Sequence, residues 1–132
     1  MKLLLLIIIG FFQTLYAEDL QILDGNSFEG SIKAKGIIGF ISVKGTLSFI
    51  NGNLNWIVGE EIDSAPYKIT KKNGTFHFTS NVINNDGDVV NWSGHYDGNT
   101  VTHVEAVWIR EKGDFIHDLL LPNKVTLLFS PN

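Results

Sequence analysis

The sequence predicts an all-β fold, an eight-stranded up-and-down antiparallel β-barrel that follows a short leader segment. Three observations predict it. Apolar and polar residues alternate with period two, Asn-Gly and Asp-Gly pairs separate the alternating runs, and no long window after the leader has helical spacing. Strands joined by short links form a meander, and closing it into a barrel removes the exposed edges. A two-sheet β-sandwich of the same strands is the alternative.

Residues 1–17 have the layout of a secretory signal peptide. Lys2 supplies the positive start, an apolar run follows, and Leu15 and Ala17 occupy the −3 and −1 positions of a cleavage site after Ala17. The apolar run is short for a bilayer span, which makes an uncleaved anchor the less favoured alternative. We therefore expect one exported domain, residues 18–132, after removal of the leader.

The composition limits which cellular compartments and which classes of function fit this protein. A chain of 132 residues fits one domain, and the absence of Cys excludes a disulfide scaffold, a thiol nucleophile and thiolate metal sites. Small secreted eukaryotic domains commonly carry disulfides, so a bacterial periplasmic or secreted protein fits better. A formal net charge of −4 and a pI near 5.4 argue against nucleic acid as a partner.

Turn signals place most of the strands. Asn-Gly and Asp-Gly pairs accept the positive φ that tight hairpins require, and they lie between alternating runs. Residues 84–88 form a further turn, and residues 28–34 and 125–129 supply the first and last strands. The hairpins pair 46–50 with 53–58 across Asn51-Gly52, 67–71 with 75–83 across Asn73-Gly74, and 89–96 with 100–110 across Asp97-Gly98-Asn99.

Three segments have weaker patterns. Residues 36–43 are apolar and Gly-bearing, and they start the second strand or form a short lid. Residues 115–121 form one helical turn or an extended plug that ends before a proline. The acidic residues of 60–63 fit a solvated connecting loop.

This pattern of short alternating strands and tight turns resembles that of the calycin-like barrels, which include the lipocalins and the fatty-acid-binding proteins. The resemblance implies the architecture alone. No Gly-x-Trp signature occurs near the first predicted strand, so no ligand site is carried over from those families.

Pairing the strands outward from the two central turns places Phe78 opposite Gly94 and Trp92 opposite Val104. One face of the sheet is then apolar and aromatic, as a barrel core requires. Gly94 leaves room there for an aromatic ring or opens a cavity beside Trp92. This face carries Phe76, Phe78, Val82, Val90, Trp92, Tyr96, Val104, Ala106 and Trp108.

The aromatic face predicts a non-catalytic exported protein that binds a small hydrophobic or aromatic molecule inside the barrel or at its mouth, without a cofactor. A fully packed core is the competing interpretation of the same face. A structural or interaction module that contacts a partner through its loops is a further alternative. The predicted ligand-binding residues are Phe76, Phe78, Trp92, Gly94, Tyr96 and Trp108.

The opposite face gathers His77, His95, His103 and Glu105 on three neighbouring strands. Directly opposed residues have Cβ atoms about 5 Å apart, three imidazoles with an open position suit zinc, and a carboxylate can orient a ring or act as a base. This predicts the alternative function, a metal- or His-dependent hydrolase or isomerase. The competing interpretation is an ordinary polar outer surface.

Weaker candidates remain. His117 with Asp114 suggests acid–base chemistry at the barrel mouth, against a loop anchored by apolar side chains. Residues 84–88 offer oxygens for calcium but lack a bidentate Glu, and turn chemistry accounts for them equally. Asn73 and Asn91 match the glycosylation pattern, which applies in a eukaryotic source.

Overall fold

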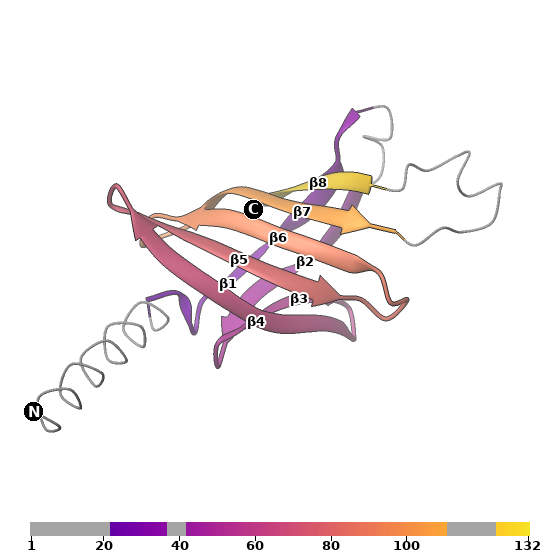
Figure 1. Cartoon of the computed structure of the whole chain (residues 1–132), viewed down its shortest axis with the longest axis horizontal. Coiled ribbons are helices and arrows are strands. Elements are labelled where there is room, and N and C mark those ends of the chain that lie inside the picture. Colours follow the sequence, from indigo (N-terminus) through magenta and orange to yellow (C-terminus); the bar gives the residue numbers. More distant parts are fainter. Residues whose placement is uncertain (1–21, 37–41, 111–123) are drawn as a thin grey trace, which may run out of the picture.

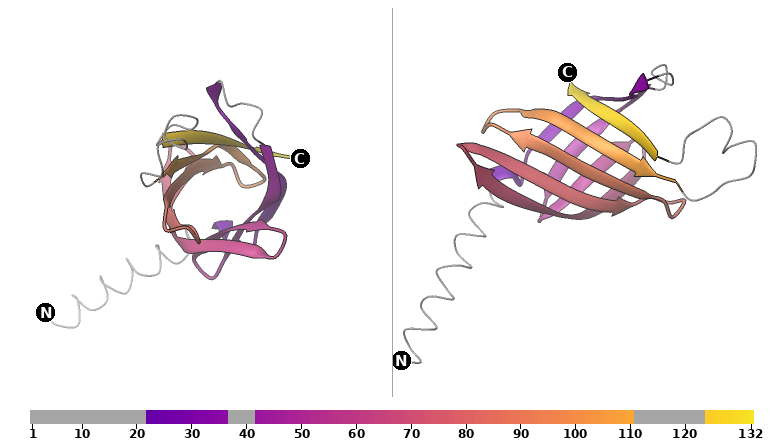
Figure 2. Two further views of the ribbon diagram at one scale, coloured as in Figure 1. Left: turned by 90° about the vertical axis from the view of Figure 1, so that its right-hand side faces the viewer. Right: turned by 45° about the horizontal axis from the view of Figure 1, so that its top comes forward.

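The computed structural model describes residues 22–36, 42–110 and 124–132, and these form a closed antiparallel β-barrel (Figure 1). Each strand pairs with the next along the chain, and β1 also pairs with β8, which completes the ring seen end-on in Figure 2. The predicted up-and-down barrel is confirmed. The strands are β1 Ser27–Ala34, β2 Ser42–Ile50, β3 Asn53–Val58, β4 Glu61–Lys72, β5 Thr75–Ile83, β6 Val89–Tyr96, β7 Val101–Ile109 and β8 Lys124–Pro131.

Alternation along the strands builds a single core. Apolar side chains at every second position point to the barrel axis, and the residues between them lie outside. The predicted turns at Asn51 and Asn73 are present, each with a φ of 53°, as a tight hairpin turn requires. The strand pattern and the turn chemistry therefore agree with each other along most of the chain.

Strand β4 is longer than the sequence predicts. It pairs with β3 from Val58 opposite Glu61 through Trp56 opposite Asp63. The interpretation of the acidic residues as a connecting loop is therefore wrong for Glu61 and Asp63, whereas Glu60 does lie in the turn between the strands. Because the ladder continues, strand alternation places Asp63 on the inward side together with Ala65 and Tyr67. A carboxylate thus enters the barrel where only a loop was expected.

The pairing of β6 with β7 also differs from the prediction. Trp92 lies opposite Ala106 instead of Val104, because a β-bulge interrupts the ladder between Ser93 and His95. His103, with a φ of 51°, lies in β7 at this irregularity. The bulge bends the strand while Ala106 stays in the core.

The turn that follows β6 contributes to the same shift. Asp97 Oδ1 accepts hydrogen bonds from the backbone N–H groups of Asn99 and Thr100, both at 2.8 Å. This holds Thr100 outside the ladder, and Tyr96 pairs with Val101 instead. Val101 therefore becomes a fully buried core residue that the predicted register did not include.

A short N-terminal turn closes one end of the barrel. Leu23 is completely buried there, and Asp24 accepts hydrogen bonds from the Tyr67 hydroxyl at 2.7 Å and from the backbone N–H of Gly52 at 3.0 Å. The backbone N–H of Gly25 adds a bond to the carbonyl of Phe49. Residues 23–25 of this turn are called the plug below, and the end of the barrel that they close is called the plug end. They are distinct from the segment 115–121 discussed above.

Some predictions lie outside the described residues. They concern the leader at 1–17, most of the segment 36–43, and the segment 115–121 with Asp114 and His117. In the part of the chain that is described, no helix has the length and apolarity needed to cross a membrane.

Candidate functional site

The barrel interior has two unlike halves, and the half next to the plug is filled. Phe49 packs edge-on against Tyr67 and Phe78, with ring centroids 5.1 and 5.0 Å apart. Phe28 adds edge contacts to Phe49 and Tyr96 at 6.4 and 6.2 Å. These edge-packed rings occupy the interior in this half of the barrel.

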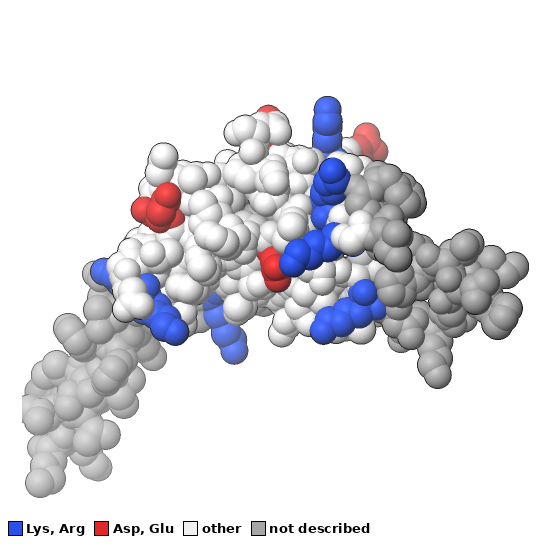
Figure 3. Space-filling model, turned by 90° about the horizontal axis from the view of Figure 1, so that it is seen from above, with Lys and Arg blue, Asp and Glu red and all other residues white. Residues whose placement is uncertain are grey.

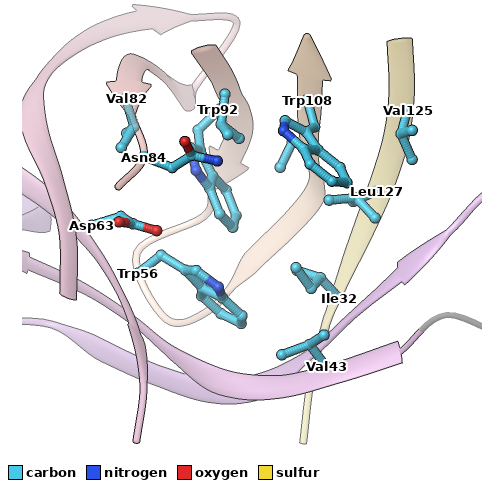
Figure 4. Close-up of a pocket in the computed structure, with 12 residues that line it drawn as sticks. Ile32, Val43, Trp56, Asp63, Val82, Asn84, Trp92, Trp108, Val125 and Leu127 are labelled. Atoms are coloured by element: carbon cyan, nitrogen blue, oxygen red, sulfur yellow. The ribbon is translucent and has the colours of Figure 1, made fainter. Parts of the chain in front are cut away.

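The other half, at the end away from the plug, contains a cavity of about 210 Å³. Figure 4 shows the side chains that line it. Its walls are almost entirely apolar, and strands from the whole circumference contribute to them. The lining residues are Ile32, Val43, Trp56, Asp63, Val82, Asn84, Val90, Trp92, Ala106, Trp108, Val125 and Leu127.

All three tryptophans of the chain line this cavity. The rings of Trp56 and Trp92 lie 5.5 Å apart at an angle of 42°, and Trp108 donates its indole N–H to Asp88 Oδ2 at 3.0 Å. Gly45 creates the space for Trp56, because a Cβ at that position would lie 2.7 Å from the indole ring. The tryptophans are thus held in place and still present surface to the empty volume.

Two polar side chains interrupt the apolar wall. Asn84 also organises the β5–β6 turn, since its Oδ1 accepts the backbone N–H groups of Asp86 and Asp88 at 3.0 and 2.9 Å. These bonds explain the turn without calcium. Asp63 lies on β4, and Figure 4 shows its carboxylate turned into the space beside Trp56.

The environment of Asp63 raises the pKa of its carboxyl group above 3.8. Partial burial contributes most, and the neighbouring negative charges of Glu61 and Asp86 add to it. Within the described residues, no hydrogen bond or ion pair engages the carboxylate. A charge in this position is therefore poorly compensated.

The structure separates the six residues predicted to bind a ligand. Trp92 and Trp108 line the cavity, whereas Phe76, Phe78, Gly94 and Tyr96 do not. A Cβ on Gly94 would lie 2.6 Å from the Phe78 ring, so this glycine makes room for that ring and not for a cavity. We revise the candidate ligand site accordingly, because the aromatic face extends over both halves of the barrel.

The predicted histidine cluster does form on the outside of the sheet. The ring centroids of His77 and His95 are 4.1 Å apart, and those of His95 and His103 are 5.1 Å apart. Glu105 forms an exposed ion pair with Lys35, in which Glu105 Oε1 lies 4.0 Å from Lys35 Nζ. Among the described residues, no group of three or more His, Asp or Glu side chains is arranged to hold a metal ion, so the metal-site hypothesis gains no support.

The histidines nevertheless influence one another. The pKa of His95 is lowered from 6.5, first by desolvation and then by the nearby charges of His77 and His103. Burial and the proximity of two other imidazoles account for the lowered pKa of His95, and a bound metal ion is not needed to explain it.

The predicted inward face includes five of the lining residues, but it includes neither Trp56 nor Asp63. The five are Val82, Val90, Trp92, Ala106 and Trp108. Alternation in residues 53–58 would have placed Trp56 inside the barrel, and alternation through Ala65 and Tyr67 would have placed Asp63 there too. A carboxylate at an inward strand position is itself a signal, because charges are rarely buried without a reason.

Comparisons of the chain with protein-family models, with curated proteins and with solved structures give no match. The cavity and its residues are therefore the basis of the functional assignment that follows.

Proposed function

We propose that this protein is an exported, non-catalytic binding protein that holds a small apolar or aromatic molecule in the cavity half of the barrel. One observation carries the proposal. A cavity of about 210 Å³ with apolar walls contains every tryptophan of the chain. Concave, mostly apolar pockets with few polar groups are the usual form of small-molecule sites.

The size of the cavity limits the ligand. An engineered apolar cavity of about 150 Å³ takes up benzene, so a volume of about 210 Å³ suits a single ring with a short substituent. Burying about 200 Å² of apolar ligand surface at roughly 25 cal/mol per Å² contributes about 5 kcal/mol. The expected dissociation constant of a neutral one-ring molecule is therefore about 0.1–1 mM.

A titration with benzyl alcohol tests the proposal. Trp56 and Trp92 border the empty volume, so a bound ring changes their environment, and we expect saturable quenching or a spectral shift of tryptophan fluorescence. The proposal would be contradicted if benzyl alcohol, at several times the expected dissociation constant, changed neither the fluorescence spectrum nor the melting temperature.

A cavity-filling variant locates the binding. Ala106 is fully buried and lines the cavity, so Ala106→Leu occupies volume that the ligand needs. We expect it to abolish the fluorescence change while the protein stays folded. Val107→Leu, at the next position on the same strand but outside the lining, is the matched control and retains binding. Equal binding by both variants would place the ligand elsewhere.

A further inference from the structure

We infer that the cavity selects a molecule that carries a positive charge, an amine or a quaternary ammonium on an apolar body, with the charge beside Asp63 and the body between the tryptophans. This inference rests on the proposed function, because it concerns the same cavity. It adds the chemical class of the ligand.

The charge of the lining has one sign. Among the described residues that line the cavity, Asp63 alone is ionisable. Its strand position directs it inward, opposite Trp56 in the β3–β4 ladder. An anionic ligand would meet this carboxylate at close range, whereas a cationic one would compensate it.

The neighbours of Asp63 make that compensation favourable. Glu61 on the same strand and Asp86 in the β5–β6 turn add negative potential. Strand β3, which pairs with this end of β4, contributes no titratable side chain. The carboxylate thus has repulsive neighbours and a partly desolvated position, and a ligand cation is the group that would relieve both.

The aromatic walls favour the same charge. A cation near the face of an indole ring is attracted by its quadrupole, and Trp is the strongest of the aromatic residues in this respect. The protein already contains one such contact, since the guanidinium of Arg110 lies 5.3 Å from the centre of the Trp108 ring. Arg110 does not line the cavity, which leaves Trp56 and Trp92 for the ligand.

Basic residues do occur near this end of the barrel. Figure 3 shows several Lys and Arg side chains on the face that it presents, towards the end away from the plug. They lie on the outer surface, and no Lys or Arg of the described residues contributes to the lining. Asp63 is therefore the one charged side chain of the described residues that a bound molecule meets in the cavity wall.

Three probes of one size test the inference: benzylamine, benzyl alcohol and benzoate, which are cationic, neutral and anionic at pH 7. We expect benzylamine to bind about tenfold more tightly than benzyl alcohol, as a charge-assisted hydrogen bond together with a cation–π contact would give. We expect benzoate to bind more weakly than both. Fluorescence titration of the full chain measures all three.

Asp63→Asn is the decisive variant. It keeps the side-chain shape and removes the charge, so the preference for benzylamine should disappear while benzyl alcohol binds as before. Glu60→Gln removes one negative charge from the adjacent turn without touching the lining, and should keep the preference. A melting temperature close to that of the unmodified protein shows that each variant folds.

The outcomes separate this inference from the proposed function. Equal binding of benzylamine and benzyl alcohol, or a preference that survives in Asp63→Asn, would overturn the cation inference and leave the binding function intact. Absence of binding by all three probes would overturn both.

Discussion

The two halves of the barrel are built from the same strands and the same alternation, yet one is filled and the other is hollow. Next to the plug, Phe49 lies in the centre of a group of edge-packed rings. At the other end, Val, Ile, Leu and Ala side chains and the three tryptophans surround a cavity of about 210 Å³. Strand geometry sets which residues face inward, and side-chain volume then decides whether the interior is core or site.

Truncating one leucine in each half would test this contrast with the largest expected effect. Leu54 is fully buried next to Phe49, whereas Leu127 borders the cavity. We expect Leu54→Ala to lower the free energy of unfolding by about 3–5 kcal/mol, because it leaves a void among well-packed rings. Leu127→Ala should cost about 2 kcal/mol, because its side chain already lacks neighbours on the cavity side. Urea unfolding measures both, and equal costs would remove the distinction between the halves.

Removing the hydroxyl that holds the plug should have the next largest effect. Tyr67→Phe takes away the 2.7 Å hydrogen bond to Asp24, and we expect a loss of about 1.5–3 kcal/mol in unfolding free energy, as for other hydrogen bonds to charged groups. Binding of benzyl alcohol should not change, because the plug and the cavity are at opposite ends. Weaker binding in this variant would show that the two halves are coupled.

The pH dependence of stability probes the cavity half through Asp63. Its pKa in the folded protein lies above 3.8, so the folded state binds more protons than the unfolded state in the window above that value. Stability from this group is present at low pH and decreases as the pH rises through the folded pKa. At neutral pH we expect Asp63→Asn to be more stable than the unmodified protein, by less than about 1 kcal/mol because solvent screens the charge.

The difference should vanish well below pH 3.8, where Asp63 is protonated in both the folded and the unfolded state. Thermal unfolding of both proteins across that range gives the measurement. A stability difference that stays constant with pH would mean that Asn alters packing instead of charge.

The histidines on the outer face should show the smallest effect. The pKa of His95 lies below 6.5, so stability from this group rises with pH through the window just below 6.5. In His77→Gln we expect the His95 pKa to move upward but not to return fully, because desolvation is the larger cause. Titration of the ring protons by NMR follows the shift, and a downward move would contradict the proposed repulsion.

The sequence allowed the barrel to be predicted because alternation and turn chemistry act locally. Asn51-Gly52 and Asn73-Gly74 need only their own φ angles to turn the chain. The bulge at His103 could not be anticipated in this way, because it depends on how β7 fits β6 and β8 together.

The cavity was only partly predictable for a related reason. Trp92 and Trp108 were expected to face the axis, and they do. Whether Phe78 or Trp56 borders empty space depends on which end of the barrel the plug fills. The position of the plug is set by the contact between Asp24 and Tyr67, which are far apart in the chain. Asp63 was assigned to a loop because acidic residues are typical of turns, although its alternation with Ala65 fits a strand.

The plug has a consequence for how a ligand would reach the interior of the barrel. Leu23 and Asp24 occupy one end of the described barrel, so a route straight through the interior along the axis is blocked there. If the cavity binds a ligand as proposed, uptake and release would then share one route and one energy barrier. Under the proposed function, the protein would carry or sequester its ligand and would not conduct it from one side of the barrel to the other.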